Sequence, residues 1–110
     1  MAGKFEIYKD NSGEFRFRLK AGNGQIILAS EGYKAKPSAI NGIDSVKKNA
    51  SQDGLYDRSE TAAGKFRFNL KATNGQIIGT SQLYTSVSAR ENGIESVKSN
   101  APEVVVDDLS

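Results

Sequence analysis

The stretch Phe15-Arg16-Phe17-Arg18-Leu19-Lys20-Ala21-Gly22-Asn23-Gly24-Gln25-Ile26-Ile27 returns as Phe66-Arg67-Phe68-Asn69-Leu70-Lys71-Ala72-Thr73-Asn74-Gly75-Gln76-Ile77-Ile78. The offset of 51 residues holds without a gap over 15–50, and 21 of those 36 aligned positions are identical. The 110-residue chain therefore holds two copies of one unit, repeat 1 at 3–50 and repeat 2 at 54–101. A unit of about 50 residues rarely keeps a stable core alone. We therefore expect one domain, 1–102, in which the repeats pack on each other.

Each repeat has the pattern of three strands. Lys4–Tyr8 alternates apolar and polar residues, as does the stretch that begins at Phe15, which is typical of half-buried strands. Asn23-Gly24 and its copy Asn74-Gly75 predict tight type I′ hairpins, because both central residues of that turn need a positive φ. The return strands are expected at 25–30 and 76–81.

A helix is expected after the third strand of each repeat. Ile43 and Val46 are three residues apart, as are their copies in repeat 2, which places an apolar pair on one helix face. Pro37 suits a first helical turn in repeat 1, whereas Ser86 or Ser88 is the candidate cap in repeat 2.

Glycines occupy the middle of both expected helices. Gly42 and Gly93 each cost about 1 kcal/mol relative to Ala in a helix interior. Their presence in both copies predicts a close backbone contact, either with the sheet or with the other helix. The fold class is therefore α+β: two tandem β-β-β-α repeats that form a single sheet, with two helices on one face.

These motifs resemble those of the YegP-like family of small bacterial proteins. The resemblance covers nearly the whole chain and runs from Phe66 to Ile78, from Ser81 to Tyr84 and from Asn92 to Asn100, with the same pattern in repeat 1. It implies two β3-α units that share one sheet and exchange their C-terminal helices. It brings no established activity and no catalytic residues. Repeat 1 departs from the pattern at 34–37, where its helix begins.

Composition excludes several kinds of site. The chain has no Cys and no His, and its formal net charge is +2. Disulfides, thiolate nucleophiles, imidazole metal ligands and a histidine catalytic base are therefore absent. We expect no cofactor and no metal. Charged residues near the amino end interrupt any signal-peptide core, and no apolar run is long enough to cross a membrane. We expect a soluble, cytoplasmic protein.

Recurring polar residues offer little support for an enzyme. Ser30 and Ser81 follow the third strands, each with a tyrosine three positions later, Tyr33 and Tyr84. A serine nucleophile needs a base and an oxyanion hole. We interpret the serines as strand ends, and each tyrosine as a packed ring whose hydroxyl bonds the backbone. Glu91 and Glu95 are four residues apart on a helix, where solvation is the simpler explanation.

One surface has a possible functional meaning. Five cations share the sheet face opposite the apolar residues: Arg16, Arg18, Lys20, Arg67 and Lys71. Such a face is able to bind phosphates, as in single-strand binders, although those proteins also use aromatic platforms that this face lacks. A solvated face that prevents aggregation is the alternative, and it is favoured because charged residues usually lie outside.

The last eight residues form an acidic tail, 103–110, which we expect to be mobile. Two other arrangements stay open: the tail folds over the basic face, or its valines add to a sheet edge. The sequence favours a monomeric, non-enzymatic binding or accessory module of unknown partner. Polyanion or nucleic-acid binding through the five cations is the alternative.

Overall fold

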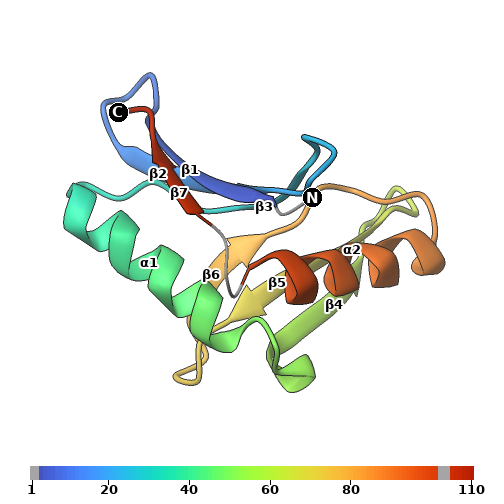
Figure 1. Cartoon of the computed structure of the whole chain (residues 1–110). Coiled ribbons are helices and arrows are strands. Elements are labelled where there is room, and N and C mark those ends of the chain that lie inside the picture. The colour runs from blue at the N-terminus through green and yellow to red at the C-terminus, as the bar shows by residue number, and fades with distance from the viewer. Residues whose placement is uncertain (1–2, 102–104) are drawn as a thin grey trace.

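The computed structural model describes residues 3–101 and 105–110. A seven-stranded sheet has the order β4-β5-β6-β3-β2-β1-β7, and both helices lie on one of its faces (Figure 1). The elements are β1 (Lys4–Lys9), β2 (Phe15–Lys20), β3 (Ile26–Ala29), α1 (Lys36–Asn49), a short 3₁₀ turn (Asp53–Leu55), β4 (Tyr56–Glu60), β5 (Phe66–Lys71), β6 (Ile77–Thr80), α2 (Val87–Asn100) and β7 (Val105–Asp108). This arrangement confirms the predicted α+β class, with two β-β-β-α repeats in one sheet.

Strand alternation builds the core as the sequence predicts. Phe17 and Leu19 of β2 are completely buried, as are their copies Phe68 and Leu70 of β5. They pack against the apolar stripes of the helices, in which Val46 and Val97 are also fully buried. The type I′ prediction is wrong, because no described residue other than glycine has a positive φ and that turn also needs one at Asn23 and Asn74. Both hairpins turn instead at a single glycine with positive φ, 85° at Gly24 and 86° at Gly75. Such values are why these positions need glycine.

The two helices begin differently. The Ser86 hydroxyl caps α2 by accepting a hydrogen bond from the Ala89 amide at 3.1 Å, so of the two candidate serines it is Ser86 that caps. In α1 the equivalent residue is Ala35, whose methyl group cannot accept a capping hydrogen bond, and Pro37 occupies the first turn. The proline removes one amide that would otherwise lack a partner. The divergence at 34–37 therefore changes the cap and leaves the helix in place.

Each helix rests on both repeats. α1 packs on β2 of its own repeat and on β6 of repeat 2, while α2 packs on β5 of its own repeat and on β3 of repeat 1. These contacts do not bear out a full exchange of helices. Because each helix lies over the seam between the repeats, the core is continuous across it.

The tail differs from the expected mobile segment. Val105–Asp108 form β7, which pairs in parallel with β1 and adds a strand to the sheet edge. Asp107 forms an ion pair with Lys4 at 3.3 Å, and Asp108 forms one with Lys36 at the start of α1. The edge alternative is therefore correct for these four residues. Residues 103 and 104 of the predicted tail lie outside the described part of the chain, as do 1, 2 and 102 at the ends of the predicted domain.

The seam between the repeats explains one difference between the copies. β3 and β6 pair only at Ala29 and Thr80. Beside that pair, a β-carbon on Gly79 would lie 2.7 Å from side-chain atoms of Leu28, the equivalent residue in repeat 1. The two equivalent positions meet at the seam and only one side chain fits there, so one copy has leucine and the other glycine.

Charged side chains line the exposed edge of the sheet at β4. Ile7 and Ile40 of repeat 1 are replaced in repeat 2 by Arg58 and Glu91, which form an ion pair at 2.9 Å. Arg58 also reaches Asp53 at 3.0 Å. Charged side chains at a sheet edge discourage pairing with another chain. The described helices include none long and apolar enough to cross a membrane.

Candidate functional site: two clefts between the repeats

The predicted basic face holds an ion-pair cluster around Glu6. This glutamate is 4% exposed, and its carboxylate meets Arg18 at 2.7 Å, Lys20 at 3.2 Å and Lys4 at 3.4 Å. Burial alone would raise the pKa of Glu6, but hydrogen bonds from these three cations outweigh it and hold the pKa at about 2. Arg18 also stacks over the Tyr8 ring, 4.5 Å from its centroid. Two of the five predicted cations therefore neutralise a buried acid.

The remaining predicted cations are less tightly held. Arg16 bonds Asp10 at 2.7 Å, and that guanidinium keeps the pKa of the Asp10 carboxyl far below its usual range. Lys71 lies 3.7 Å from Asp57. Arg67 forms no ion pair with any other described residue. The three cations of β2 and the two of β5 lie on strands that are separated by β6 and β3. Four of the five already have a carboxylate partner.

The recurring serines are structural. The Ser30 hydroxyl accepts a hydrogen bond from the Phe17 amide at 2.9 Å and donates to the Glu31 carbonyl at 2.8 Å. Ser81 makes the same two bonds with Phe68 and Gln82. With its proton and a lone pair both engaged, neither hydroxyl is placed to act as a nucleophile. Among the described residues, no group of three or more Asp or Glu side chains is arranged to hold a metal ion.

Two clefts that the sequence did not predict as sites lie between the repeats, and a third hollow of about 330 Å³ lies beside Gly3, Lys20 and Val105. Cleft 1, with a volume of about 490 Å³, lies between the β2–β3 hairpin of repeat 1 and the β6–α2 segment of repeat 2. Cleft 2, about 230 Å³, has the reverse arrangement, with the hairpin of repeat 2 and the β3–α1 segment of repeat 1. The equivalent lining residues are Ala21/Ala72, Asn23/Asn74, Gln25/Gln76, Ile27/Ile78, Gln82/Glu31, Tyr84/Tyr33, Ala89/Ser38, Asn92/Asn41, Gly93/Gly42 and Ser96/Ser45. Eight of these ten pairs are identical, and each of these two clefts needs both repeats.

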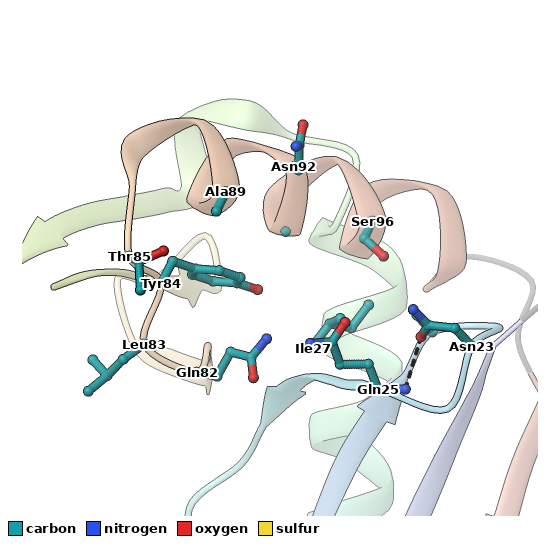
Figure 2. Close-up of a pocket in the computed structure, with 12 residues that line it drawn as sticks. Asn23, Gln25, Ile27, Gln82, Leu83, Tyr84, Thr85, Ala89, Asn92 and Ser96 are labelled. Carbon is teal, nitrogen blue, oxygen red and sulfur yellow. Dashed lines mark hydrogen bonds between the residues drawn. The ribbon is translucent and has the colours of Figure 1, made fainter.

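Polar groups meet across cleft 1. Figure 2 shows the carboxamides of Gln25 and Gln82 pointing toward each other from opposite walls, with Ser96 directed toward Asn23 at one end. The Asn23 side-chain oxygen is occupied, since it accepts a hydrogen bond from the Gln25 amide at 3.0 Å. The lining of this cleft carries no charged side chain. Cleft 1 therefore offers neutral hydrogen-bonding groups above an apolar floor.

A tyrosine closes the inner end of each cleft. The Tyr84 ring stacks on Phe68 with centroids 6.3 Å apart, and burial raises its pKa. Among the described residues its buried hydroxyl has no hydrogen bond of good geometry, and the nearby Gln82 side chain only partly offsets the rise in pKa. The expected bond to the backbone is therefore wrong for this residue. A β-carbon at Gly93 would lie 2.3 Å from that oxygen. A β-carbon at Gly42 would lie 2.8 Å from Phe17 of the sheet and 2.9 Å from the Tyr33 oxygen. The helix glycines thus mark close approaches by side chains beneath the helix, and the nearest atoms do not belong to the other helix.

Four exposed amide side chains line the clefts without contributing a hydrogen bond to the described fold. The side chains of Gln25 and Gln76, and of Asn41 and Asn92, are exposed and form no hydrogen bond with another described residue. Neighbouring exposed positions differ between the copies, as Asp44 and Glu95 do on the helices. The repetition of these amides was visible in the sequence. What was not visible is that a hairpin of one repeat faces the helix of the other.

Comparisons with known proteins agree with this architecture. A family model described as a domain of unknown function, DUF1508, matches residues 10–57 and 62–108. The chain is 61% identical over 106 residues to a UPF0339 protein in the 5′ region of the ptx operon of Stutzerimonas stutzeri, covering 96% of each chain. It is 52% identical over 108 residues to the UPF0339 protein YegP of Escherichia coli K12, covering 98% of each.

Two solved structures have the same fold. The solution structure of YegP from Escherichia coli superposes with a TM-score of 0.94 at 51% identity, covering 99% of this chain and 94% of that one. The solution structure of a UPF0339 protein from Shewanella oneidensis gives a TM-score of 0.94 at 48% identity, covering 99% and 92%. The names of these relatives assign no activity to them.

Proposed function

The chain belongs to the DUF1508 family of YegP-like proteins, and for this member we propose a non-enzymatic binding module whose ligand sites are the two inter-repeat clefts. The observation that carries the proposal is the pair of equivalent linings, in which exposed amide side chains recur without a hydrogen bond to another residue of the described chain. Binding sites are typically concave, with a few converging polar groups on an apolar lining. The engaged hydroxyls of Ser30 and Ser81 support a non-enzymatic role.

A backbone-amide NMR titration with pools of small neutral compounds tests this proposal. We expect saturable shifts at Gln25, Gln82 and Ser96, and at their counterparts across cleft 2, with the open sheet face unaffected. Shifts confined to the open face around Arg16 and Arg18 would contradict it. A cytoplasmic location belongs to the proposal, and the absence of Cys is compatible with a reducing compartment.

Polyanion binding through the basic face is the second candidate. A calculated pI of about 8.9 favours it. The ion pairs formed by Arg16, Arg18, Lys20 and Lys71 oppose it, because a phosphate would have to displace carboxylates already in place. Arg67 alone is left without a carboxylate among the described residues. A binding module that uses the clefts is therefore the stronger candidate.

A further inference from the structure

Both clefts lie where the hydrogen-bonded pairing between β3 and β6, at the centre of the sheet, ends. Pairing between β3 and β6 is limited to Ala29 and Thr80. If the antiparallel ladder continued, Ile27 would lie opposite Gln82 on one side of that pair, and Ile78 opposite Glu31 on the other. No backbone hydrogen bond joins either couple in the described part of the chain. Each of these four residues lines a cleft.

An interrupted ladder leaves strand edges in the middle of a sheet. Backbone amide and carbonyl groups on such an edge need partners, and an added extended chain supplies them through main-chain hydrogen bonds. In cleft 1 the carboxamides of Gln25 and Gln82 stand beside this edge and point toward each other (Figure 2). A carboxamide presents a donor and an acceptor together, which matches a peptide group.

From this geometry we infer that cleft 1 binds a short, extended, uncharged peptide segment, a ligand class that rests on the proposed function. The peptide's main chain bonds the free edge at Ile27 and the carboxamides of Gln25 and Gln82. Its small apolar side chains rest on Ile27 and Ala21. The volume of about 490 Å³ accommodates a few residues, and the lining without charge favours a ligand without charge.

A sugar fits the same cleft less well. Carbohydrate sites usually present an aromatic face, and the ring of Tyr84 is stacked on Phe68 with its hydroxyl directed at Gly93. The remaining apolar lining is aliphatic: Ala21, Ile27, Leu83 and Ala89. Leu83 is 56% exposed beside the cleft, where an apolar side chain of a bound peptide would cover it.

Cleft 2 differs at the residue that faces the hairpin. Glu31 replaces Gln82 there, and the cavity is about half as large, 230 Å³ against 490 Å³. A carboxylate accepts hydrogen bonds but donates none, so it cannot serve both sides of a peptide group. Uncharged peptide therefore binds cleft 1 more tightly than cleft 2. Exchanging the two side chains, with Gln82→Glu and Glu31→Gln, should reverse the preference.

The test is an NMR titration of the full chain with acetyl-Ser-Leu-Ser-Leu-amide. Its matched probe is the same peptide with both leucine nitrogens methylated, which removes two main-chain donors. We expect the first peptide to cause saturable shifts at Ile27 and Gln82, and the methylated one to bind at least tenfold more weakly. Equal shifts from both peptides would overturn main-chain recognition.

Two variants and a titration with a sugar distinguish failure of the peptide proposal from failure of the proposed function. Gln25→Ala should weaken peptide binding by about three- to tenfold, the effect of losing one hydrogen bond. Ser88→Ala, at an exposed position of α2 outside the cleft, should leave it unchanged. Maltose is titrated in parallel. Cleft shifts from maltose and none from the peptide would overturn the peptide class and leave the proposed function standing, whereas saturable peptide shifts only outside both clefts would overturn both.

Discussion

Gly93 and Tyr84 form one structural unit. The helix has no β-carbon where the tyrosine oxygen approaches, and the oxygen is buried without a hydrogen bond to any residue that the structure describes. The cost of glycine in a helix is thus offset by a ring that packs beneath it. The sequence predicted the close approach, because a glycine that recurs inside a helix needs a reason. It did not reveal which group approaches, since that depends on how the loop after β6 returns beneath α2.

At this contact we expect a substitution to change the free energy of unfolding in the direction opposite to the one that helix propensity predicts. Gly93→Ala improves the intrinsic preference for helix by about 1 kcal/mol. A β-carbon 2.3 Å from the Tyr84 oxygen forces the two apart, so we expect a net loss of about 2 kcal/mol. Tyr84→Phe removes an unbonded hydroxyl and should be neutral, or stabilising by about 1 kcal/mol. Urea unfolding measures both, and stabilisation by Gly93→Ala would contradict the contact.

Because of Glu6, we expect the free energy of unfolding to depend on pH in the acidic range. Its pKa is about 2 in the folded protein against an ordinary value of 4.5, so the folded state binds fewer protons over that interval. The contribution of Glu6 is therefore fully present above pH 4.5 and is lost as the pH falls through 2. We expect Glu6→Gln to lower the free energy of unfolding by roughly 2 kcal/mol at pH 7, because three cations lose their shared partner.

The same variant tests the assignment at low pH. Its free energy of unfolding should fall less steeply than that of the parent between pH 4.5 and pH 2.5, and the two curves should converge. Parallel curves over this range would show that Glu6 is not the group responsible. Glu95→Gln, on an exposed part of α2, is the matched control and should leave the curve unchanged.

At the scale of elements, short-range pattern predicted most of the structure. The strands alternate, the Asn-Gly turns fall between β2 and β3 and between β5 and β6, and the helices carry their apolar pairs. The sequence leaves β7 open as one of three arrangements of the tail, because Val105–Asp108 combines two valines with two acids and has no alternation. Its place depends on the parallel edge of β1 and on Lys4 and Lys36, which lie far away in sequence.

Removing β7 should weaken the fold and uncover an edge. A chain that ends at residue 104 loses the pairing with β1 and the ion pairs of Asp107 and Asp108. We expect a loss of about 1–2 kcal/mol and faster hydrogen exchange along β1, since its outer edge becomes unpaired. An unchanged exchange rate at Phe5 and Ile7 would contradict the role assigned to β7.

At the scale of the molecule, the repeats depend on each other. α1 rests partly on β6 and α2 partly on β3, so each half alone exposes part of a helix stripe and a strand edge. The duplicated motif made this dependence predictable. The clefts were not, because they arise from residues of different repeats that no local pattern connects.

Separated halves should show that dependence. Residues 1–53 and 54–110 expressed alone should be unfolded or should dimerise, and mixing them should restore the spectrum of the full chain. Circular dichroism and sedimentation measure both properties. The full chain should sediment as a monomer. A half that is folded and monomeric on its own would contradict the shared core.

Salt dependence tests the basic face. A face whose cations already have carboxylate partners should bind a single-stranded 20-mer of DNA weakly even at about 50 mM salt. Fluorescence anisotropy measures this binding. Tight binding that falls steeply with salt, and that is lost when Arg16, Arg18 and Lys20 are all replaced by glutamine, would instead support polyanion recognition.

The central claim is that each ligand site is built from both repeats. Chemical-shift titration with acetyl-Ser-Leu-Ser-Leu-amide, repeated on the variants Gln25→Ala, Gln82→Ala and Gln76→Ala, tests it most directly. Gln25 and Gln82 belong to different repeats but share cleft 1, whereas Gln25 and Gln76 are equivalent residues in different clefts. We predict that the first two variants weaken the same set of shifts, at Ile27 and Ser96, and that Gln76→Ala leaves that set unchanged. Loss of the Ile27 and Ser96 shifts in Gln76→Ala, with their retention in Gln82→Ala, would contradict the claim.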